Sequence, residues 1–274
     1  MSGFLDDMAR SSAARVLEAK QHESFADLER RVRGMPRAAP LAVSPAGFDV
    51  IAELKLRSPA AGPLGSEAQD WPARIAAYAR GGAAAVSVLT EPSRFDGSLD
   101  HLREAARVLA PLGVPAMRKD FLVDPYQVLE ARAAGAGGVL VIARMLTAPR
   151  IALLLDAAAE HGMFVLLEAF DAADLESTRQ LLGKRRTQNT VLVGVNCRDL
   201  QTLQVVQQRF ATLAPLLPHE WPCVAESGVA TPGDAVSMRR LGYRMALIGT
   251  ALMGADEPQT LLAEILSAAR TPGI

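Results

Sequence analysis

From residue 49 onward, short apolar runs alternate with longer amphipathic stretches. The apolar runs are rich in β-branched residues and end at a polar residue, and the amphipathic stretches are rich in Ala, Leu, Arg and Glu. This alternation predicts strands followed by helices, and near-continuous apolar strands are typical of a parallel sheet buried on both faces. We expect eight strands, at 49–56, 84–90, 114–120, 137–143, 163–169, 191–197, 222–227 and 244–250.

Eight strand–helix units predict an α/β fold of the closed (β/α)8 TIM-barrel type. The alternative is an open doubly wound sheet, which usually carries a Gly-rich phosphate turn after its first strand. In this chain that position reads LKLRSPAAG (54–62), which has no such pattern. The barrel is therefore favoured.

The N-terminal residues do not share this alternation. They contain an amphipathic stretch, LDDMARSSAARVLEAK (5–20), a shorter one, FADLERRV (25–32), and a Pro- and Ala-rich connector. We expect residues 1–48 to form a helical extension that packs on the barrel, and residues 49–274 to form the barrel domain. A partly disordered tail is the alternative.

Composition narrows the class of protein. The 274 residues are half hydrophobic, enough for a large core, and the net charge of −1 argues against a nucleic-acid or membrane-surface partner. There is no signal-peptide pattern and no apolar run long enough to span a bilayer. Two cysteines, Cys197 and Cys223, and four scattered histidines form no metal-ligand spacing, so we expect a cytoplasmic protein without a metal site.

Charged and polar residues interrupt the apolar strands near their C-terminal ends, where barrel enzymes place their chemistry. A single residue of this kind is as readily a rim charge satisfied by a loop, but six at equivalent positions favour a shared site. Lysine–carboxylate networks shift proton affinities and supply general acids and bases, so proton transfer fits better than acyl-enzyme chemistry. The six residues are Glu53, Lys55, Lys119, Glu168, Asn196 and Glu226.

The last two predicted strands end in Gly and hydroxyl residues, in AESGV (225–229) and LIGTALMGA (247–255). The loops after strands seven and eight, with a short extra helix, form the recurrent phosphate site of these barrels. Ser227, Gly228, Gly249 and Thr250 are therefore candidates for phosphate binding. The Pro- and Gly-containing loop 57–65 is either a mobile cover for a ligand or a plain surface turn.

Seven segments together resemble indole-3-glycerol phosphate synthase, and they occur in that family's order. In tryptophan biosynthesis this enzyme closes, decarboxylates and dehydrates 1-(2-carboxyphenylamino)-1-deoxyribulose 5-phosphate. The E-x-K-x-x-S-P and R-K-D-F patterns are highly specific together, whereas the G-T pattern is not. The segments are AELKLRSPAAG (52–62), SVLTEPSRFDGS (87–98), MRKDFLVDPYQV (117–128), LLEAFDAADL (166–175), VGVNCRDL (193–200), AESGV (225–229) and LIGTALM (247–253).

The resemblance implies roles for the site residues. Lys119 would be the general acid that protonates the sugar carbonyl, and Glu168 the acid or base of the dehydration. Lys55 would bind the substrate carboxylate with Glu53 positioning it, and the polar network would be completed by Asn196 and Glu226. The implied phosphate-binding residues are Arg198, Ser227, Gly228, Gly249 and Thr250, and the other implied substrate-binding residues, mostly around the ring, are Ser58, Pro59, Leu89, Phe95, Phe121, Leu200 and Leu203.

The resemblance implies neither a metal nor a coenzyme, one small phosphorylated substrate, and a monomer or weak homodimer. Cys197 and the SPAAG loop (58–62) depart from the family's usual residues, which affects loop dynamics and rate rather than reaction class. A paralogue serving a secondary indole pathway stays open.

Two rival functions are weaker. A phosphoribosylanthranilate isomerase-type barrel would use a Cys–Asp pair where the first strand supplies Glu53 and Lys55. A catalytically silent subunit would be expected to lose rim lysines or carboxylates, and all are present.

Overall fold

The eight predicted strands form a closed parallel barrel in a computed structural model, which describes residues 3–58, 62–63, 70–185, 190–199, 202 and 204–271. Each observed strand lies within its predicted range. The first strand pairs with both the last strand and the second barrel strand, so the sheet has no edges and the open-sheet alternative is wrong. In barrel order, the strands are β1 (Asp49–Leu54), β10 (Met245–Ile248), β9 (Cys223–Glu226), β8 (Val191–Asn196), β7 (Phe164–Ala169), β6 (Gly138–Ile142), β5 (Ala116–Lys119) and β4 (Ala85–Leu89).

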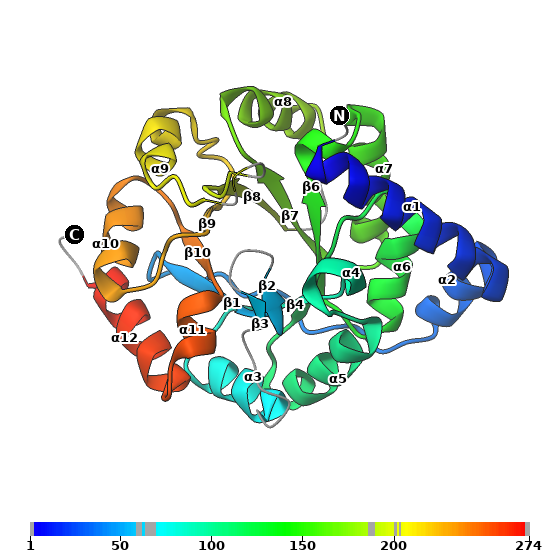
Figure 1. Cartoon of the computed structure of the whole chain (residues 1–274), viewed down its shortest axis with the longest axis horizontal. Coiled ribbons are helices and arrows are strands. Elements are labelled where there is room, and N and C mark those ends of the chain that lie inside the picture. Colours follow the sequence, from blue (N-terminus) through cyan, green and yellow to red (C-terminus); the bar gives the residue numbers. More distant parts are fainter. Residues whose placement is uncertain are drawn as a thin grey trace.

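Helices surround the barrel in a ring, as Figure 1 shows when the molecule is viewed along the barrel opening. Several begin with a side-chain cap and a proline in the first turn, which satisfies or removes N–H groups that have no partner within the helix. The ring contains α3 (Trp71–Arg80), α5 (Leu99–Leu109), α6 (Pro125–Ala133), α7 (Ala148–Glu160), α8 (Ala172–Gly183), α9 (Gln208–Leu213), α10 (Pro232–Arg240) and α12 (Pro258–Arg270).

Shorter elements lie in the loops between these strands and helices. They are the hairpin of β2 (Arg57–Ser58) and β3 (Gly62–Pro63), the helices α4 (Pro92–Phe95) and α11 (Thr250–Gly254), and the 3-10 turns η1 (Ala110–Leu112), η2 (Ala143–Met145) and η3 (Ala214–Leu216). Within the described ranges, none of the helices is both long and apolar enough to cross a membrane.

The strands place alternate residues inside the barrel. One apolar layer inside the barrel includes Ile51, Met117 and Leu166, whereas a second, larger cluster fills the space between strands and helices. Side chains two positions apart on a strand point to the same side. The polar residues Glu53, Lys119 and Glu168 therefore continue these inward-facing rows at the C-terminal end of the barrel.

Two N-terminal helices, α1 (Phe4–His22) and α2 (Phe25–Arg33), lie against the β5–α6 side of the barrel. Arg15 binds both carboxylate oxygens of the fully buried Asp120, at 2.8 and 2.9 Å, and the side-chain nitrogen of Gln127 donates to Ser12 at 2.8 Å. In Figure 1, α1 crosses one side of the barrel opening, next to α6 and α7. These contacts bring the N-terminus to the rim where the predicted site lies.

Candidate active site

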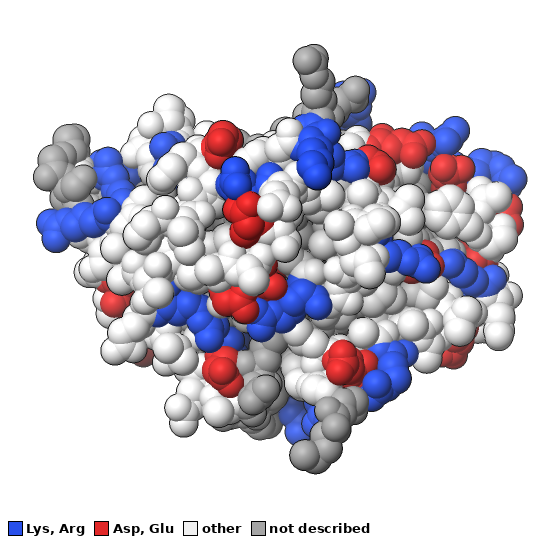
Figure 2. Space-filling view, turned by 90° about the horizontal axis from the view of Figure 1, so that it is seen from above, with Lys and Arg blue, Asp and Glu red and all other residues white. Residues whose placement is uncertain are grey.

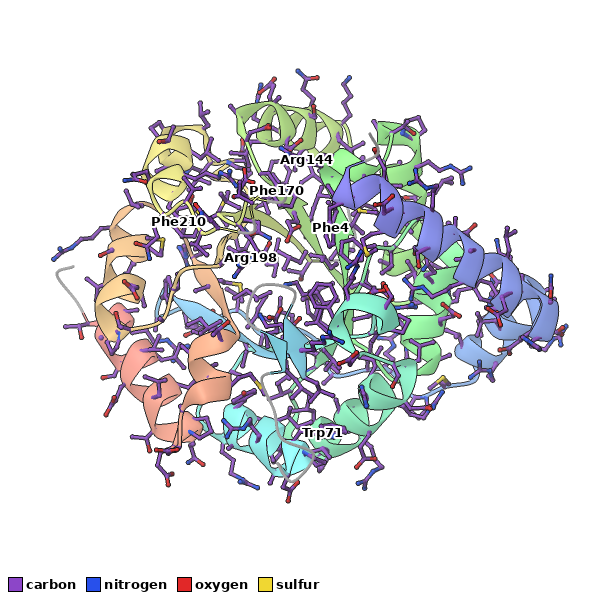
Figure 3. All side chains as sticks on the ribbon, viewed as in Figure 1. Phe4, Trp71, Arg144, Phe170, Arg198 and Phe210 are labelled. Carbon is purple, nitrogen blue, oxygen red and sulfur yellow. The ribbon has the colours of Figure 1, made fainter. Side chains whose placement is uncertain are left out.

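A cavity of about 1100 Å³ lies at the C-terminal ends of the barrel strands. In Figure 3, Phe4, Phe170 and Arg198 lie around the barrel opening, whereas Trp71 lies in the outer ring. Among the residues selected from the sequence, the cavity is lined by Glu53, Lys55, Leu89, Phe95, Lys119, Phe121, Glu168, Asn196, Arg198, Ser227, Gly228, Gly249 and Thr250.

Five of the selected residues are not among the described residues that line this cavity. Pro59, Leu200 and Leu203 lie outside the described residues, and for Ser58 only the backbone, in β2, is described. Glu226 is buried at 1% exposure and borders the site from within the barrel. Glu226 therefore belongs to the polar network from a buried position next to the cavity, and not as one of its lining residues.

Glu53 lies between two lysines. Its carboxylate is 2.7 Å from Nζ of Lys119 and 3.2 Å from Nζ of Lys55. Burial by itself would raise the pKa of Glu53, but the charges and hydrogen bonds of the two ammonium groups outweigh burial and lower this pKa to about 2. Glu53 is therefore ionised at neutral pH and holds both lysines at the cavity.

Lys119 is surrounded by carboxylates. Burial would lower its pKa, but the negative charges of Glu53, Glu226 and Glu168 raise the pKa well above its ordinary value. The Lys119 ammonium group therefore stays protonated at neutral pH and faces the cavity with a proton to donate.

Asn196 orients the second half of the site. Its Nδ2 donates to Oε2 of Glu168 at 3.0 Å, while its Oδ1 accepts from Oγ of Ser227 at 3.0 Å and from the backbone N–H of Arg198 at 2.9 Å. Both ends of the amide are used, so its orientation is determined. Asn196 links Glu168 to two of the five predicted phosphate-binding residues, Arg198 and Ser227.

Glu226 and Glu168 share one environment. Neither side-chain oxygen of Glu226 accepts from an N–H or hydroxyl donor in the described part of the chain. Burial and the neighbouring Glu168 carboxylate raise the pKa of Glu226 well above its ordinary value, and burial also raises the pKa of Glu168. Both shifts favour the neutral, protonated form of Glu226, which avoids placing two negative charges side by side.

Two glycines leave room for these carboxylates. A Cβ on Gly249 would lie 2.5 Å from Oε1 of Glu53, and a Cβ on Gly194 would overlap Oε1 of Glu226. Gly249 was selected from the sequence as a phosphate-site residue, whereas Gly194 was not selected. Its signal was a glycine inside an otherwise β-branched strand, where a close approach is one common reason for glycine.

The turn after β9 and the start of α11 form another part of the cavity wall. Ser227 and Gly228 both have left-handed backbone conformations, with φ of 67° and 89°. The short helix α11 begins directly after β10, and its first residues, Thr250 and Ala251, line the cavity. Because N–H groups in the first turn of a helix have no partner within it, this end suits an anion.

Apolar side chains cover a third part of the wall. The ring centroid of Phe121 is 5.7 Å from that of Phe4 and 6.2 Å from that of Phe95. Phe4, Leu5, Leu140, Ile142 and Phe170 also line the cavity but were not selected from the sequence. Leu140 and Ile142 carry the alternate-position signal of an inward-facing strand, whereas Phe4 reaches the site through the docking of α1.

Cys197 lies between two residues of the site but faces away from it. It is fully buried and belongs to the cluster between strands and helices, and burial raises its pKa to about 12. Its backbone N–H donates to the carbonyl of Glu226 at 3.0 Å. Cys197, which departs from the family's usual residue, therefore leaves the backbone pairing of β8 and β9 intact.

The sequence profile of indole-3-glycerol phosphate synthase matches residues 5–265. The chain belongs to the indole-3-glycerol phosphate synthase family. A synthase of this name from Parafrankia sp. is 40% identical over 98% of this chain and 97% of its own length, and one from Bordetella pertussis is 37% identical over 97% of this chain and all of its own length. The resemblance expected from the motifs is confirmed.

Solved structures with little sequence similarity share the architecture. A tryptophan synthase structure from M. tuberculosis superposes with a TM-score of 0.58 at 15% identity, over 82% of this chain and 94% of that one. A thiamine phosphate pyrophosphorylase from Pyrococcus furiosus gives 0.56 at 13% identity, over 82% and 95%. At such identities the likeness shows the barrel fold alone.

Proposed function

We propose that this chain converts 1-(2-carboxyphenylamino)-1-deoxyribulose 5-phosphate to indole-3-glycerol phosphate by general acid–base catalysis, as a carboxy-lyase of tryptophan biosynthesis. The observation that carries the proposal is the convergence of Lys119, Lys55 and Glu168 on one cavity with an anion-compatible end. The geometry suits a substrate that has an aromatic ring, a carboxylate and a phosphate.

In the proposed ring closure, Lys119 is the general acid. The ring carbon that bears the carboxylate attacks the sugar carbonyl carbon, a carbon–carbon bond forms, and the carbonyl oxygen takes the Lys119 proton. The raised pKa of Lys119 supports this role because it keeps the donor protonated before the reaction. Glu53, at 2.7 Å, holds the ammonium group in place.

In the proposed decarboxylation, Lys55 first binds the substrate carboxylate. The carbon–carbon bond to the carboxylate then breaks, CO₂ departs, and the electron pair of that bond restores the aromatic ring. The pairing of Lys55 with Glu53, at 3.2 Å, supports this role because it leaves Lys55 in the cavity wall next to Lys119.

In the proposed dehydration, Glu168 transfers protons. The new hydroxyl group leaves as water after taking one proton, and a second proton is removed from the neighbouring ring carbon. Asn196 orients Glu168, and the raised pKa of Glu168 brings its protonation equilibrium toward neutral pH, where one group can act as both acid and base.

The substrate phosphate is proposed to bind between the turn at Ser227 and Gly228 and the start of α11, with Arg198 beside them. The aromatic ring is proposed to lie between Leu89, Phe95 and Phe121. The proposal that residues 1–48 form an extension of the barrel domain 49–274 is supported by the Arg15–Asp120 pair.

We also propose that the enzyme works in the cytoplasm as a monomer or weak homodimer without a nucleic-acid partner. The net charge of −1 supports the absence of a nucleic-acid partner. On the face drawn in Figure 2, Lys and Arg alternate with Asp and Glu, as suits a surface that attracts no polyanion.

The test supplies the anilino-sugar phosphate substrate and follows indole fluorescence, without added metal. We expect turnover by the native chain and a loss of about 100-fold or more in Lys119→Ala, since positioned acid–base groups contribute about 10²–10⁴-fold. Lys184→Ala, which removes an exposed lysine after α8, is the control and should keep native turnover. A strict metal requirement or undiminished turnover in Lys119→Ala would contradict the proposal.

A further inference from the structure

Arg144 covers one face of Phe170. Arg144 lies in η2, directly after β6, and Phe170 directly follows β7. The guanidinium carbon is 4.6 Å from the centroid of the Phe170 ring, well within the range of a cation–π contact. In Figure 3, Arg144 lies farther from the barrel opening than Phe170.

Two aspartates hold the guanidinium group in this place. Nε and Nη2 of Arg144 bind Oδ2 of Asp174 at 2.8 and 2.6 Å, and Nη2 also binds Asp171 at 2.5 Å. The same Asp174 oxygen accepts the backbone N–H of Phe170 at 2.9 Å. One carboxylate therefore positions both the cation and the backbone of the residue that the cation covers.

The ring of Phe170 faces the cavity. Phe170 is 3% exposed, lines the cavity, and packs in the same cluster as Phe121 and Ile142. Arg144 is not among the described residues that line the cavity. The cation thus covers Phe170 from outside, while the ring itself forms part of the wall.

The pairing of Arg144 with both aspartates also limits its capacity to bind the substrate directly. Nε and Nη2 of Arg144 both bind carboxylates, so the guanidinium group, although still a cation, has less capacity to bind a substrate anion. Its remaining effect inside the site is on Phe170, because a cation over one ring face draws π-electron density and makes the other face less negative.

We propose that Phe170 is a specificity-determining wall for the aromatic ring of the substrate and that Arg144 is the positioning residue that holds and polarises it. This inference rests on the proposed function. The anilino ring of that substrate is electron-rich, so it stacks favourably on a phenyl face from which the cation has drawn electron density. Phe170 lines the same cavity as Leu89, Phe95 and Phe121, the residues proposed to bind the ring, and packs in the same cluster as Phe121.

The test measures affinity by calorimetry in the Lys119→Ala background, where turnover does not interfere. Two probes are compared: the anilino-sugar phosphate substrate and 1-amino-1-deoxyribulose 5-phosphate, which lacks the ring. We expect Phe170→Leu and Arg144→Met each to weaken substrate binding about fivefold, as for the loss of an aromatic pair, and to leave the ring-free probe unchanged. The double variant should bind no more weakly than Phe170→Leu alone.

Arg144→Lys separates stacking from charge. Lysine keeps a positive charge near Phe170 but not the planar fork that binds the two aspartates, so affinity for the substrate should fall less than it does in Arg144→Met. Arg179→Met, on the exposed face of α8 and paired with Glu176, is the matched control and should behave as the native chain. Thermal unfolding of each variant identifies any general loss of folding.

Equal losses for both probes would overturn the inference, because they would show a general or charge effect. Unchanged substrate affinity in Arg144→Met or Phe170→Leu would also overturn it. Absence of turnover in the native chain would refute the proposed function, whereas the difference between the two probes in calorimetry decides the role of Phe170 without any turnover.

Discussion

The Nζ atom of Lys119 lies 2.7 Å from Oε2 of Glu53, although β4 separates their two strands in the barrel. Both side chains continue inward-facing rows of their strands, so they meet across the interior at its C-terminal end. The protonation state of the proposed general acid therefore depends on a carboxylate that lies 66 positions away in the chain.

Glu53→Gln should lower the pKa of Lys119, because it removes the negative charge that does most to raise that pKa. We expect the alkaline limb of the pH profile of kcat/KM to move to lower pH by about one to three units, the usual effect of a close opposite charge. The measurement is kcat/KM from pH 6 to about 10.5 in both proteins, where the native profile should stay level at its alkaline end and that of Glu53→Gln should begin to fall. An unmoved alkaline limb would show that Lys119 is not the acid that the profile reports.

Glu226→Gln should stabilise the protein, and more so as pH rises. The pKa of Glu226 is raised in the folded state, so ionisation of this carboxyl group opposes folding. Below the pKa of the unfolded state, the group is protonated in both states and does not reduce the free energy of unfolding. As pH rises from that value through the folded-state pKa, the group lowers the free energy of unfolding. Glutamine has nearly the same shape and stays neutral at every pH, so it does not bear this cost. Urea unfolding at pH 5 and pH 8 should show a larger gain at pH 8; a gain independent of pH would refute the raised pKa of Glu226.

Gly194→Ala should displace the Glu226 carboxyl group, because the methyl group added on β8 would overlap Oε1 of Glu226 on the neighbouring strand β9. Overpacking of this kind costs about 1–3 kcal/mol in the free energy of unfolding, and we expect turnover to fall as well. Gly183→Ala, where nothing lies within 4 Å of the new Cβ, is the control. Equal stability of the two variants in urea would count against the tight fit.

Arg15→Met should loosen the N-terminal extension. It leaves the fully buried Asp120 without its bidentate partner, and the exposed fraction of the Arg15 side chain is only 25%. We expect a loss of about 1–3 kcal/mol in the free energy of unfolding, because Arg118 and Thr90 still bind Asp120.

The control for this prediction is Arg10→Met, which removes an exposed pair with Asp7 and should change stability by less than about 1 kcal/mol. If both variants unfold at the same urea concentration, α1 is not anchored by the buried pair.

The barrel and most of its rim followed from sequence periodicity and from the polar ends of the strands. Glu53, Lys119 and Glu168 were identifiable because an ionised residue in an apolar strand is costly unless it is used. The family's motifs then supplied roles that periodicity alone could not. Residues with ordinary side chains carried no such signal, and Phe170 and Phe4 were missed for that reason.

By itself, the sequence determined the eight-stranded barrel, the family and the set of polar residues at the strand ends, because hydrophobic periodicity and local motifs are properties of short segments. Only the tertiary structure decided which carboxylate meets which lysine, that Glu226 is buried next to Glu168, that α1 contributes to the cavity wall, and that Arg144 covers Phe170 from outside the cavity. These relationships join segments that are distant along the chain. They depend on barrel register and helix docking, which arise from packing of the whole molecule rather than from any one segment.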